Sequence, residues 1–238
     1  MELKEFYNKI DDWDQKVIIK YNSLGGKTLT VIFRFISFFG RETLWISLIA
    51  FFLLIWYDPF LLTHISAIFL TGVLFIAILK KVFNRARPFE RLGEDKILIL
   101  ERKPNSRSFP SWHSYNITAY SLLIGIFFLH SLLVSLLMLC LVILVCFSRI
   151  QLGVHYPTDV IIGSFLGFLG FLVSIYGVAP LLQLVVLFFE QLFINDIEYQ
   201  QINSMLCNNI GYILLTILVF LIIFLFTTYK RIRDYFKK

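Results

Sequence analysis

Charged side chains are scarce in this sequence of 238 residues. Asp, Glu, Lys and Arg together make up 16% of the chain, whereas soluble domains contain about 25% charged residues. Hydrophobic residues reach 58% and the mean hydropathy is +0.77. This composition excludes an ordinary soluble domain and predicts a membrane protein.

Cysteines are also few, and the three present show no CxxC spacing, so they do not predict a metal site. Cys140 and Cys146 lie in one apolar run and Cys207 lies beside another, and we interpret all three as small packing residues. Internal repeats and low-complexity linkers are absent from the sequence. We therefore predict one integral membrane domain over residues 1–238, because this length suits a single bundle.

Long apolar runs predict transmembrane helices, because a helix of roughly 17–25 apolar residues crosses the hydrocarbon core of a bilayer. Residues 178–194 are apolar on one face but carry Gln183, Glu190 and Gln191, so they predict an interfacial helix, with a further span as the alternative. The predicted fold is all-α, a polytopic bundle of about six spans. These spans cover about residues 42–57, 60–82, 113–129, 131–149, 157–177 and 211–229.

The N-terminal residues 1–41 lack the apolar core and small-residue cleavage site of a signal peptide. Instead, apolar side chains recur at helical spacing among charges. This pattern predicts an amphipathic helix that either lies in the membrane interface or packs on the end of the bundle. The apolar positions are Leu3, Phe6, Tyr7, Ile10, Trp13, Val17 and Ile18.

The cations are distributed unevenly along the chain. Of 22 Lys and Arg residues, seven lie in residues 1–41, nine lie between Lys80 and Arg107, Arg149 stands alone, and five close the chain after residue 229. With the predicted spans, all of them fall on one membrane face. This asymmetry indicates either a cytoplasmic face or an anion site.

Three stretches meet on that face by the parity of the spans. Lys80 and Arg87 end the second predicted span, and their spacing of about two helical turns allows both side chains to point the same way. Pro88 then discourages further helix. Each cation alone is equally typical of a side chain that reaches the interface from a helix end.

The second stretch, "SFPSWHSYN", opens the third predicted span. Pro110 interrupts the incoming loop and Ser111 is a good N-cap, so the free amides that follow predict an anion site at the start of a helix. His113 lies in the first turn beside any bound anion. An ordinary capped helix with a histidine at the membrane interface would have the same sequence pattern.

The third stretch, "SRIQLGVHYPTDV", contains Arg149, His155 and Asp159. Charges within or beside a span need a partner or a function. Asp159 follows His155 by four residues and can accept a hydrogen bond from one ring nitrogen, which leaves the other nitrogen as a nucleophile. The convergence of this stretch with the other two is much less expected by chance than any one element, and it favours a functional anion site.

The three stretches read Lys80-x6-Arg87-Pro88, Pro110-Ser111-Trp112-His113 and Ser148-Arg149-x5-His155-x3-Asp159. Together they resemble the motifs of the type 2 phosphatidic acid phosphatase (PAP2) superfamily. These are metal-independent membrane lipid phosphatases. The resemblance covers about residues 42–177. It leaves residues 1–41 as an interfacial segment and 178–238 as an interfacial helix, a last span and a basic tail.

One position departs from the family pattern. The second motif usually reads Pro-Ser-Gly-His, and Trp112 replaces the glycine here. Glycine lets a ligand approach the backbone closely. Tryptophan keeps its backbone N–H, which can still bind an anion. Its bulky side chain is expected to narrow the entrance through which the lipid reaches the site, or to stack near a lipid headgroup.

The resemblance implies a role for each motif residue. His155 attacks phosphorus and forms a phosphohistidine, Asp159 orients its ring, and His113 protonates the leaving oxygen and then activates water. The phosphoryl oxygens are held by Lys80, Arg87, Ser111, the Trp112 amide and Arg149. No metal or other cofactor is expected.

Alternatives to lipid phosphate hydrolysis are transfer of a phosphoryl or headgroup to another acceptor, a static anion or lipid site, and haloperoxidase chemistry. The expected partners are a lipid phosphate and the bilayer, without nucleic acid, and the sequence does not indicate an oligomeric state. Candidate substrates are phosphatidic acid, phosphatidylglycerophosphate, a polyprenyl diphosphate and a phosphorylated glycolipid. The resemblance places the site on the extracytoplasmic face, whereas the cation count taken literally places it in the cytoplasm.

Overall fold

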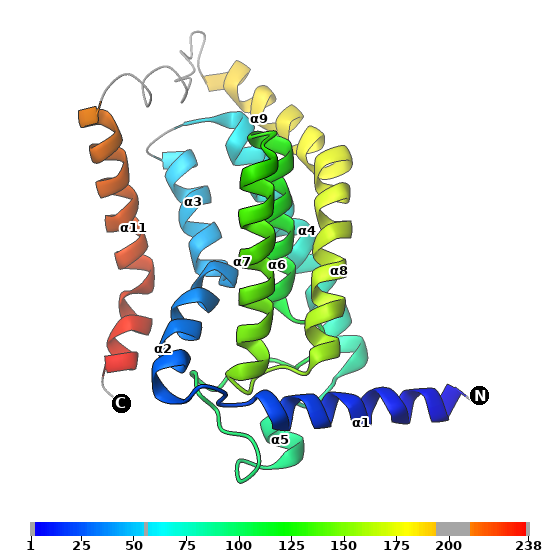
Figure 1. Cartoon of the computed structure of the whole chain (residues 1–238). Helices are drawn as coiled ribbons and strands as arrows, with labels where there is room; N and C mark the ends of the chain where they lie inside the picture. Colours follow the sequence, from blue (N-terminus) through cyan, green and yellow to red (C-terminus); the bar gives the residue numbers. More distant parts are fainter. Residues whose placement is uncertain (1–2, 55–56, 194–209, 237–238) are drawn as a thin grey trace. The chain divides into compact units, whose positions relative to one another are not determined.

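The computed structural model describes residues 3–54, 57–193 and 210–236, and every regular element in these ranges is helical, as predicted (Figure 1). Cys207 and the connection at residues 194–209 lie outside the described residues. The first helices are α1 (Leu3–Tyr21), α2 (Gly26–Ser37), the short η1 (Phe38–Gly40), α3 (Glu42–Leu54), α4 (Pro59–Phe83) and α5 (Pro88–Leu92). They are followed by α6 (Trp112–Leu122), η2 (Leu123–Phe128), α7 (Leu132–Gln151), α8 (Pro157–Val173), η3 (Ser174–Val178), α9 (Ala179–Phe193) and α11 (Ile210–Phe236).

Local signals place the helix ends. Asp58 accepts a hydrogen bond from the Leu61 amide (2.8 Å) and caps α4. The predicted N-cap Ser111 is confirmed, since its Oγ accepts from the Ser114 amide at the start of α6. After α7 the chain turns at Gly153, whose φ of +76° suits glycine. These caps set the short connections that carry the sequence motifs.

Three helical stretches are long and apolar enough to cross a membrane: Pro59–Leu92, Leu132–Gln151 and Pro157–Leu192. A bent pair, Gly26–Gly40 with Glu42–Leu53, makes a fourth if it is one span. The described residues thus give three or four candidate spans, where the sequence predicts about six. The predicted interfacial helix at 178–194 corresponds to α9, which follows η3 and α8 directly within the Pro157–Leu192 stretch.

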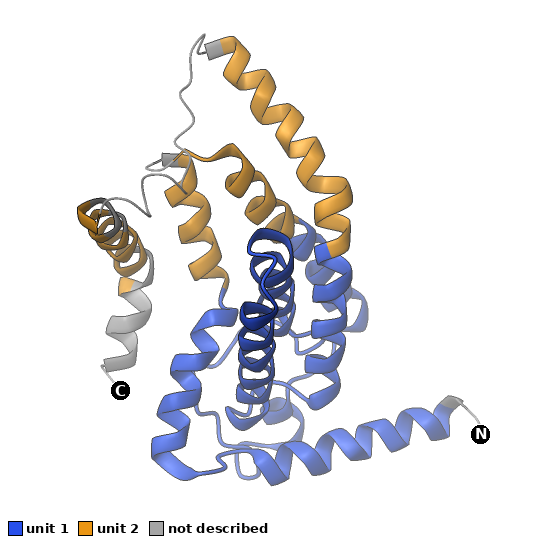
Figure 2. Cartoon of the chain, turned by 45° about the horizontal axis from the view of Figure 1, so that its top comes forward, with its two compact units in different colours: residues 1–41, 71–171 blue, residues 42–70, 172–238 orange. Residues whose placement is uncertain are grey.

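The chain divides into two compact units, residues 1–41 with 71–171 and residues 42–70 with 172–238 (Figure 2). In the second unit, the rings of Phe51 on α3 and Phe220 on α11 make an edge contact at 6.1 Å. There, Tyr57 also donates a hydrogen bond to Glu190 of α9 (2.5 Å). All motif residues belong to the first unit.

Small residues bring α6 and α8 into close contact in the first unit. A Cβ on Gly163 would lie 2.5 Å from the Ser111 carbonyl oxygen, and a Cβ on Gly167 would lie 2.6 Å from the Tyr115 carbonyl oxygen. The backbones therefore approach as they do at small-xxx-small helix interfaces in membranes. This contact holds the start of α6, with its Pro-Ser-Trp-His motif, against the start of α8.

The N-terminal helix α1 lies across the ends of α7 and α8 within the first unit (Figure 1). Ile18 is fully buried in a cluster with Phe89, Ile97 and Tyr156. Packing on the end of the bundle, one of the two predicted alternatives, is therefore confirmed. The same helix exposes several predicted apolar positions, Phe6, Tyr7 and Trp13 among them, and their contact with a membrane interface stays a prediction.

Candidate active site

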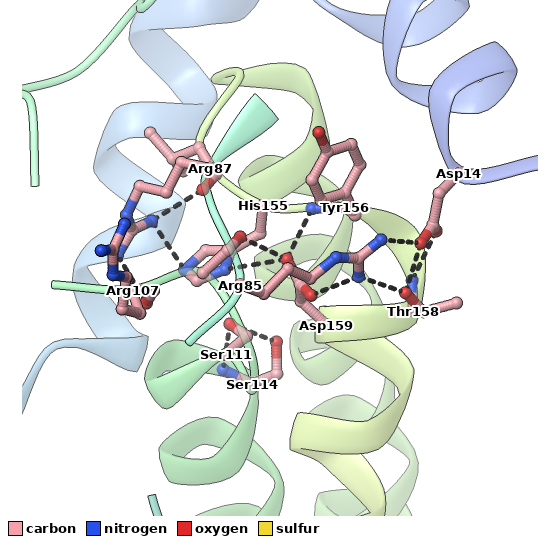
Figure 3. Close-up of polar contacts among 12 residues, drawn as sticks. Asp14, Arg85, Arg87, Arg107, Ser111, Ser114, His155, Tyr156, Thr158 and Asp159 are labelled. Atoms are coloured by element: carbon pink, nitrogen blue, oxygen red, sulfur yellow. Dashed lines mark hydrogen bonds and ion pairs between the residues drawn. The ribbon is translucent and has the colours of Figure 1, made fainter. Parts of the chain in front are cut away.

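The three motif stretches meet at one end of the first unit (Figure 3). Arg87, just after α4, places Nη1 3.3 Å from Nε2 of His155 in the α7–α8 turn. The Ser111 amide donates to the Asp159 carbonyl oxygen (2.9 Å), so the start of α6 is tied to the start of α8. The predicted convergence is therefore present in the structure.

His155 is buried and neutral. An arginine N–H can only donate, so Nε2 of His155 accepts from Arg87 and the ring proton lies on Nδ1. Burial lowers the pKa of His155 well below its usual value, and the charges of Arg87, Lys80 and Arg149 lower it further. The ring thus keeps the lone pair that a nucleophile needs.

Asp159 faces Nδ1 of His155 at 3.6 Å, a distance at which the charges interact but which is longer than a hydrogen bond. Its carboxylate is fixed by other donors. Oδ2 accepts from Ser108 Oγ (2.5 Å) and the Tyr156 amide (2.9 Å), and Oδ1 accepts from Arg85 Nη1 (2.7 Å). The aspartate is therefore held rigidly beside the imidazole.

Arg85 was not among the predicted site residues. It lies between two buried carboxylates, Asp159 of α8 and Asp14 of α1, and its Nη2 is 2.6 Å from Asp14 Oδ2. Asp14 also accepts from the Thr158 amide (2.9 Å) and from the Thr158 hydroxyl. Arg85 lies in the stretch "KKVFNRARP" two residues before Arg87, but no spacing in the sequence indicates its partner on α1.

Arg87, predicted to hold phosphate, is 2% exposed and directs its guanidinium at the surrounding chain. Nε donates to the Ser106 carbonyl (2.6 Å), Nη1 to the Val154 carbonyl (2.7 Å) and Nη2 to Ser106 Oγ (3.1 Å). The residue thus ties the loop before α6 to the turn that carries His155. Of its contacts, the one with His155 Nε2 is directed at the predicted nucleophile.

Arg149 is buried at the end of α7, and two residues that the sequence analysis did not select surround it. Its Nη1 donates to Glu101 Oε2 (2.7 Å) and to Ser37 Oγ. Arg41 lies 3.5 Å from the other Glu101 oxygen. Nε of Arg149 is buried without a hydrogen-bond partner among the described residues. Glu101 therefore fixes the guanidinium through one nitrogen and leaves Nε for another acceptor.

Burial raises the pKa of Glu101, but the charges of Arg149 and Arg41 lower it more, and the net shift is downward. The carboxylate is thus ionised at neutral pH. It provides the negative partner that a buried arginine needs when no substrate is present.

Lys80, Trp112 and His113 complete the predicted set. Lys80 is half-buried, donates to the Arg107 carbonyl and lies within electrostatic reach of Arg87 and Asp159. Nε2 of His113 is buried without a partner among the described residues. The indole of Trp112 stacks on the ring of Tyr115, with centroids 5.8 Å apart.

Metal-binding geometry does not occur in the part of the chain that the structure describes, where no three His, Cys, Asp or Glu side chains gather as ligands. The site instead gathers cationic side chains around a buried histidine. Such a set can stabilise phosphoryl oxygens by direct charge and hydrogen bonds. Metal independence itself stays a prediction.

The chain is similar in sequence and in fold to several known proteins. The family model described as PAP2 superfamily matches residues 60–183. An undecaprenyl-diphosphatase of Sulfolobus acidocaldarius is 30% identical over 155 residues, which are 63% of this chain and 70% of that protein. The crystal structure of Aquifex aeolicus LpxE matches with a TM-score of 0.56 and 26% identity, over 67% of this chain and 93% of that chain. A PAP2-type phosphatidylglycerolphosphate phosphatase of Bacillus subtilis is 26% identical, with a TM-score of 0.49, over 79% and 89% of the two chains.

Proposed function

Because the chain belongs to the PAP2 superfamily and is a multi-pass membrane phosphatase, we propose that it hydrolyses a lipid phosphate or diphosphate through a phosphohistidine at His155. The observation that supports this most is the neutral, buried imidazole, whose Nε2 lone pair points at Arg87. Splitting one displacement at phosphorus into two steps through a covalent intermediate lowers the barrier of each.

In the first step, His155 Nε2 forms a bond to phosphorus while the bond from phosphorus to the leaving oxygen breaks. His113, in its imidazolium form, gives a proton to that oxygen and becomes neutral, so the lipid leaves as an alcohol or, from a diphosphate, as a monophosphate. The imidazole becomes positively charged, and the Asp159 carboxylate 3.6 Å from Nδ1 stabilises that charge.

In the second step, water attacks phosphorus and His113 takes its proton. The nitrogen–phosphorus bond breaks, inorganic phosphate leaves, and His155 returns to its neutral form. General acid–base help of this kind contributes roughly 10²–10⁴-fold. The buried, unpartnered Nε2 of His113 is the atom proposed to carry the proton in both steps.

The phosphoryl oxygens would be held by Lys80, by Arg149 through Nε, and by the amides of the α6 N-terminus after Ser111. Arg87 would exchange its contact with His155 Nε2 for one with a phosphoryl oxygen, while its other donors keep the loop in place.

A polyprenyl diphosphate is the first candidate substrate, because a relative of 30% identity is an undecaprenyl-diphosphatase. Phosphatidic acid, phosphatidylglycerophosphate and a phosphorylated glycolipid complete the panel. We place the site on the extracytoplasmic face. Cysteines introduced at positions 89–107 should react with an impermeant reagent in intact cells, and labelling only after lysis would reject this orientation.

The experiment is phosphate release from this panel by the purified protein in lipid vesicles. Wild type should release phosphate from at least one member, and His155→Ala should lose activity by on the order of 10³-fold or more while remaining folded. Near-wild-type activity of that variant would overturn the nucleophile. Product analysis with added alcohols separates hydrolysis from transfer, and anion binding without turnover would indicate a static site.

A further inference from the structure

Asp14 is a buried carboxylate on α1 and lies outside residues 60–183, which match the family model. Its side chain is completely buried, and it accepts hydrogen bonds from Arg85, from the Thr158 amide and from the Thr158 hydroxyl. A charged carboxylate is costly to bury unless it is paired and hydrogen-bonded. Asp14 has both kinds of partner, so its charge is retained inside the protein.

Arg85 connects this carboxylate to the catalytic pair. One terminal nitrogen, Nη2, lies 2.6 Å from Asp14, and the other, Nη1, lies 2.7 Å from Asp159 (Figure 3). The guanidinium also lies over the ring of Tyr156, 4.2 Å from its centroid, which fixes its plane. A planar fork of this kind can hold two carboxylates in fixed directions, which an ammonium group cannot do.

The charge count along this chain of contacts shows what Asp14 adds. Asp14, Arg85 and Asp159 together carry a net charge of about −1, whereas Arg85 and Asp159 alone would be neutral. The phosphohistidine step makes the His155 ring positive, and the nearby cations Arg87, Lys80 and Arg149 oppose that charge. An uncompensated negative charge behind the imidazole is therefore favourable in the transition state.

We propose that Asp14 is a positioning residue for the phosphatase reaction: it balances Arg85, so that the Asp159 carboxylate remains available to the His155 imidazolium. This inference rests on the proposed function. It makes α1 part of the working site, although α1 carries none of the sequence motifs and touches no reacting atom.

The competing explanation is that Asp14 only fastens α1 to the bundle. A second carboxylate on the same helix serves as the matched control. Asp11 pairs with Arg91 through both oxygens (2.5 and 2.7 Å) and lies 3.8 Å from Arg85. It fastens α1 at a neighbouring position, and its contact with Arg85 is a longer ion pair without a hydrogen bond, unlike the 2.6 Å contact of Asp14.

The experiment compares Asp14→Asn and Asp11→Asn in vesicles, using a lipid phosphate that wild type hydrolyses. Asparagine keeps the size of aspartate and removes its charge. Asp14→Asn should lower kcat about tenfold with KM little changed, and should lower the rate of phosphoenzyme formation equally in alkaline-quench measurements. Asp11→Asn should lose thermal stability in detergent but keep kcat within about threefold of wild type.

Equal losses of kcat in both variants would show that Asp14 only fastens α1, and an unchanged kcat in Asp14→Asn would also overturn the proposal. If Asp14→Asn does not fold, Arg85→Lys tests the same link, because it keeps the charge but not the fork. That variant should lower kcat at constant KM, and wild-type kcat would contradict the link. A wild type inactive on every lipid phosphate would instead reject the proposed function.

Discussion

At the scale of single residues, Trp112 could serve a phosphate site in two ways, through its backbone amide or through its indole side chain. Its backbone amide lies at the N-terminus of α6, where free N–H groups favour an anion. Its indole is parallel to the Tyr115 ring within 16° and packs along the helix. The proposed contact of the amide with phosphate therefore does not depend on the indole.

Trp112→Gly should consequently preserve the hydrolysis of a water-soluble phosphate. It should destabilise the protein by about 1 kcal/mol, because glycine adds backbone freedom near the start of a helix and the stacking contact is lost. If the indole also shapes the lipid entrance, the ranking of catalytic efficiencies across the lipid panel changes. An unchanged ranking would limit Trp112 to packing, and complete loss of activity in a folded variant would show that the indole is needed for the chemistry.

Glu101 gives a prediction for pH. The pKa of its carboxyl lies below the ordinary value of 4.5, so its contribution to stability is present above that value and is lost as the pH falls through the folded-state pKa. We expect Glu101→Gln to melt at a lower temperature than wild type at neutral pH. The difference in melting temperature between wild type and variant should stay constant down to weakly acidic pH and become smaller below pH 4.5. A difference that is independent of pH across this range would mean that Glu101 acts through shape rather than charge.

The sequence predicted the motif residues because their spacing is internal to each stretch. Asp14, Arg85 and Glu101 could not be found in this way, since each derives its role from a partner more than 45 residues away in the chain. For a related reason, the sequence predicted Arg87 only as a phosphate-binding residue and did not predict its hydrogen bonds to the surrounding backbone. Its charge is visible in the sequence, but the carbonyl oxygens that occupy most of its fork come from loops whose course only the fold determines.

At the scale of elements, the contact between α6 and α8 sets the geometry of the site. His155 lies in the turn before α8 and Asp159 in the first turn of α8, whereas Ser111 caps α6 and His113 lies in its first turn. Any separation of these two helices therefore moves two halves of the proposed chemistry apart. Glycine at position 163 keeps them close, because the Ser111 carbonyl oxygen occupies the space where a Cβ would lie.

Gly163→Ala should therefore cost about 1–3 kcal/mol of stability and reduce kcat severalfold, since the new methyl group meets backbone rather than a flexible side chain. Gly177→Ala is the matched control, because nothing lies within 4 Å of the Cβ that it would add. Thermal melting and kcat, measured for both variants, check this prediction. Equal behaviour of the two variants would contradict a close-packed α6–α8 interface.

The composition of the sequence predicted only part of the element boundaries. Polar Gln183, Glu190 and Gln191 made residues 178–194 ambiguous, and in the structure Tyr57 satisfies Glu190 by a hydrogen bond. A partner of this kind reduces the cost of a carboxyl group in an apolar setting. Hydropathy alone cannot include it, because Tyr57 lies 133 residues earlier in the chain.

At the scale of the whole molecule, the balance of charge bears on metal dependence. Lys80, Arg87 and Arg149 act electrostatically on one imidazole, and they can supply the positive charge that a divalent cation would otherwise bring to a phosphoryl group. Activity should persist in excess chelator, and vanadate should inhibit by resembling the phosphoryl group in the transition state. Loss of activity in chelator that magnesium restores would contradict a cradle of protein donors.

The side chain of Tyr115 lies between Gly72 of α4 and Gly170 of α8. A Cβ at position 72 would come within 2.2 Å of a ring carbon, and a Cβ at position 170 within 2.3 Å of the hydroxyl oxygen. In genetic terms, substitutions at these three positions should show strong epistasis with one another. A library of random variants should yield few functional clones with a larger residue at 72 or 170 alone, and those that survive should also carry a smaller residue at 115. Natural drift at any one of these positions is thus constrained by the other two, although they lie on three different helices.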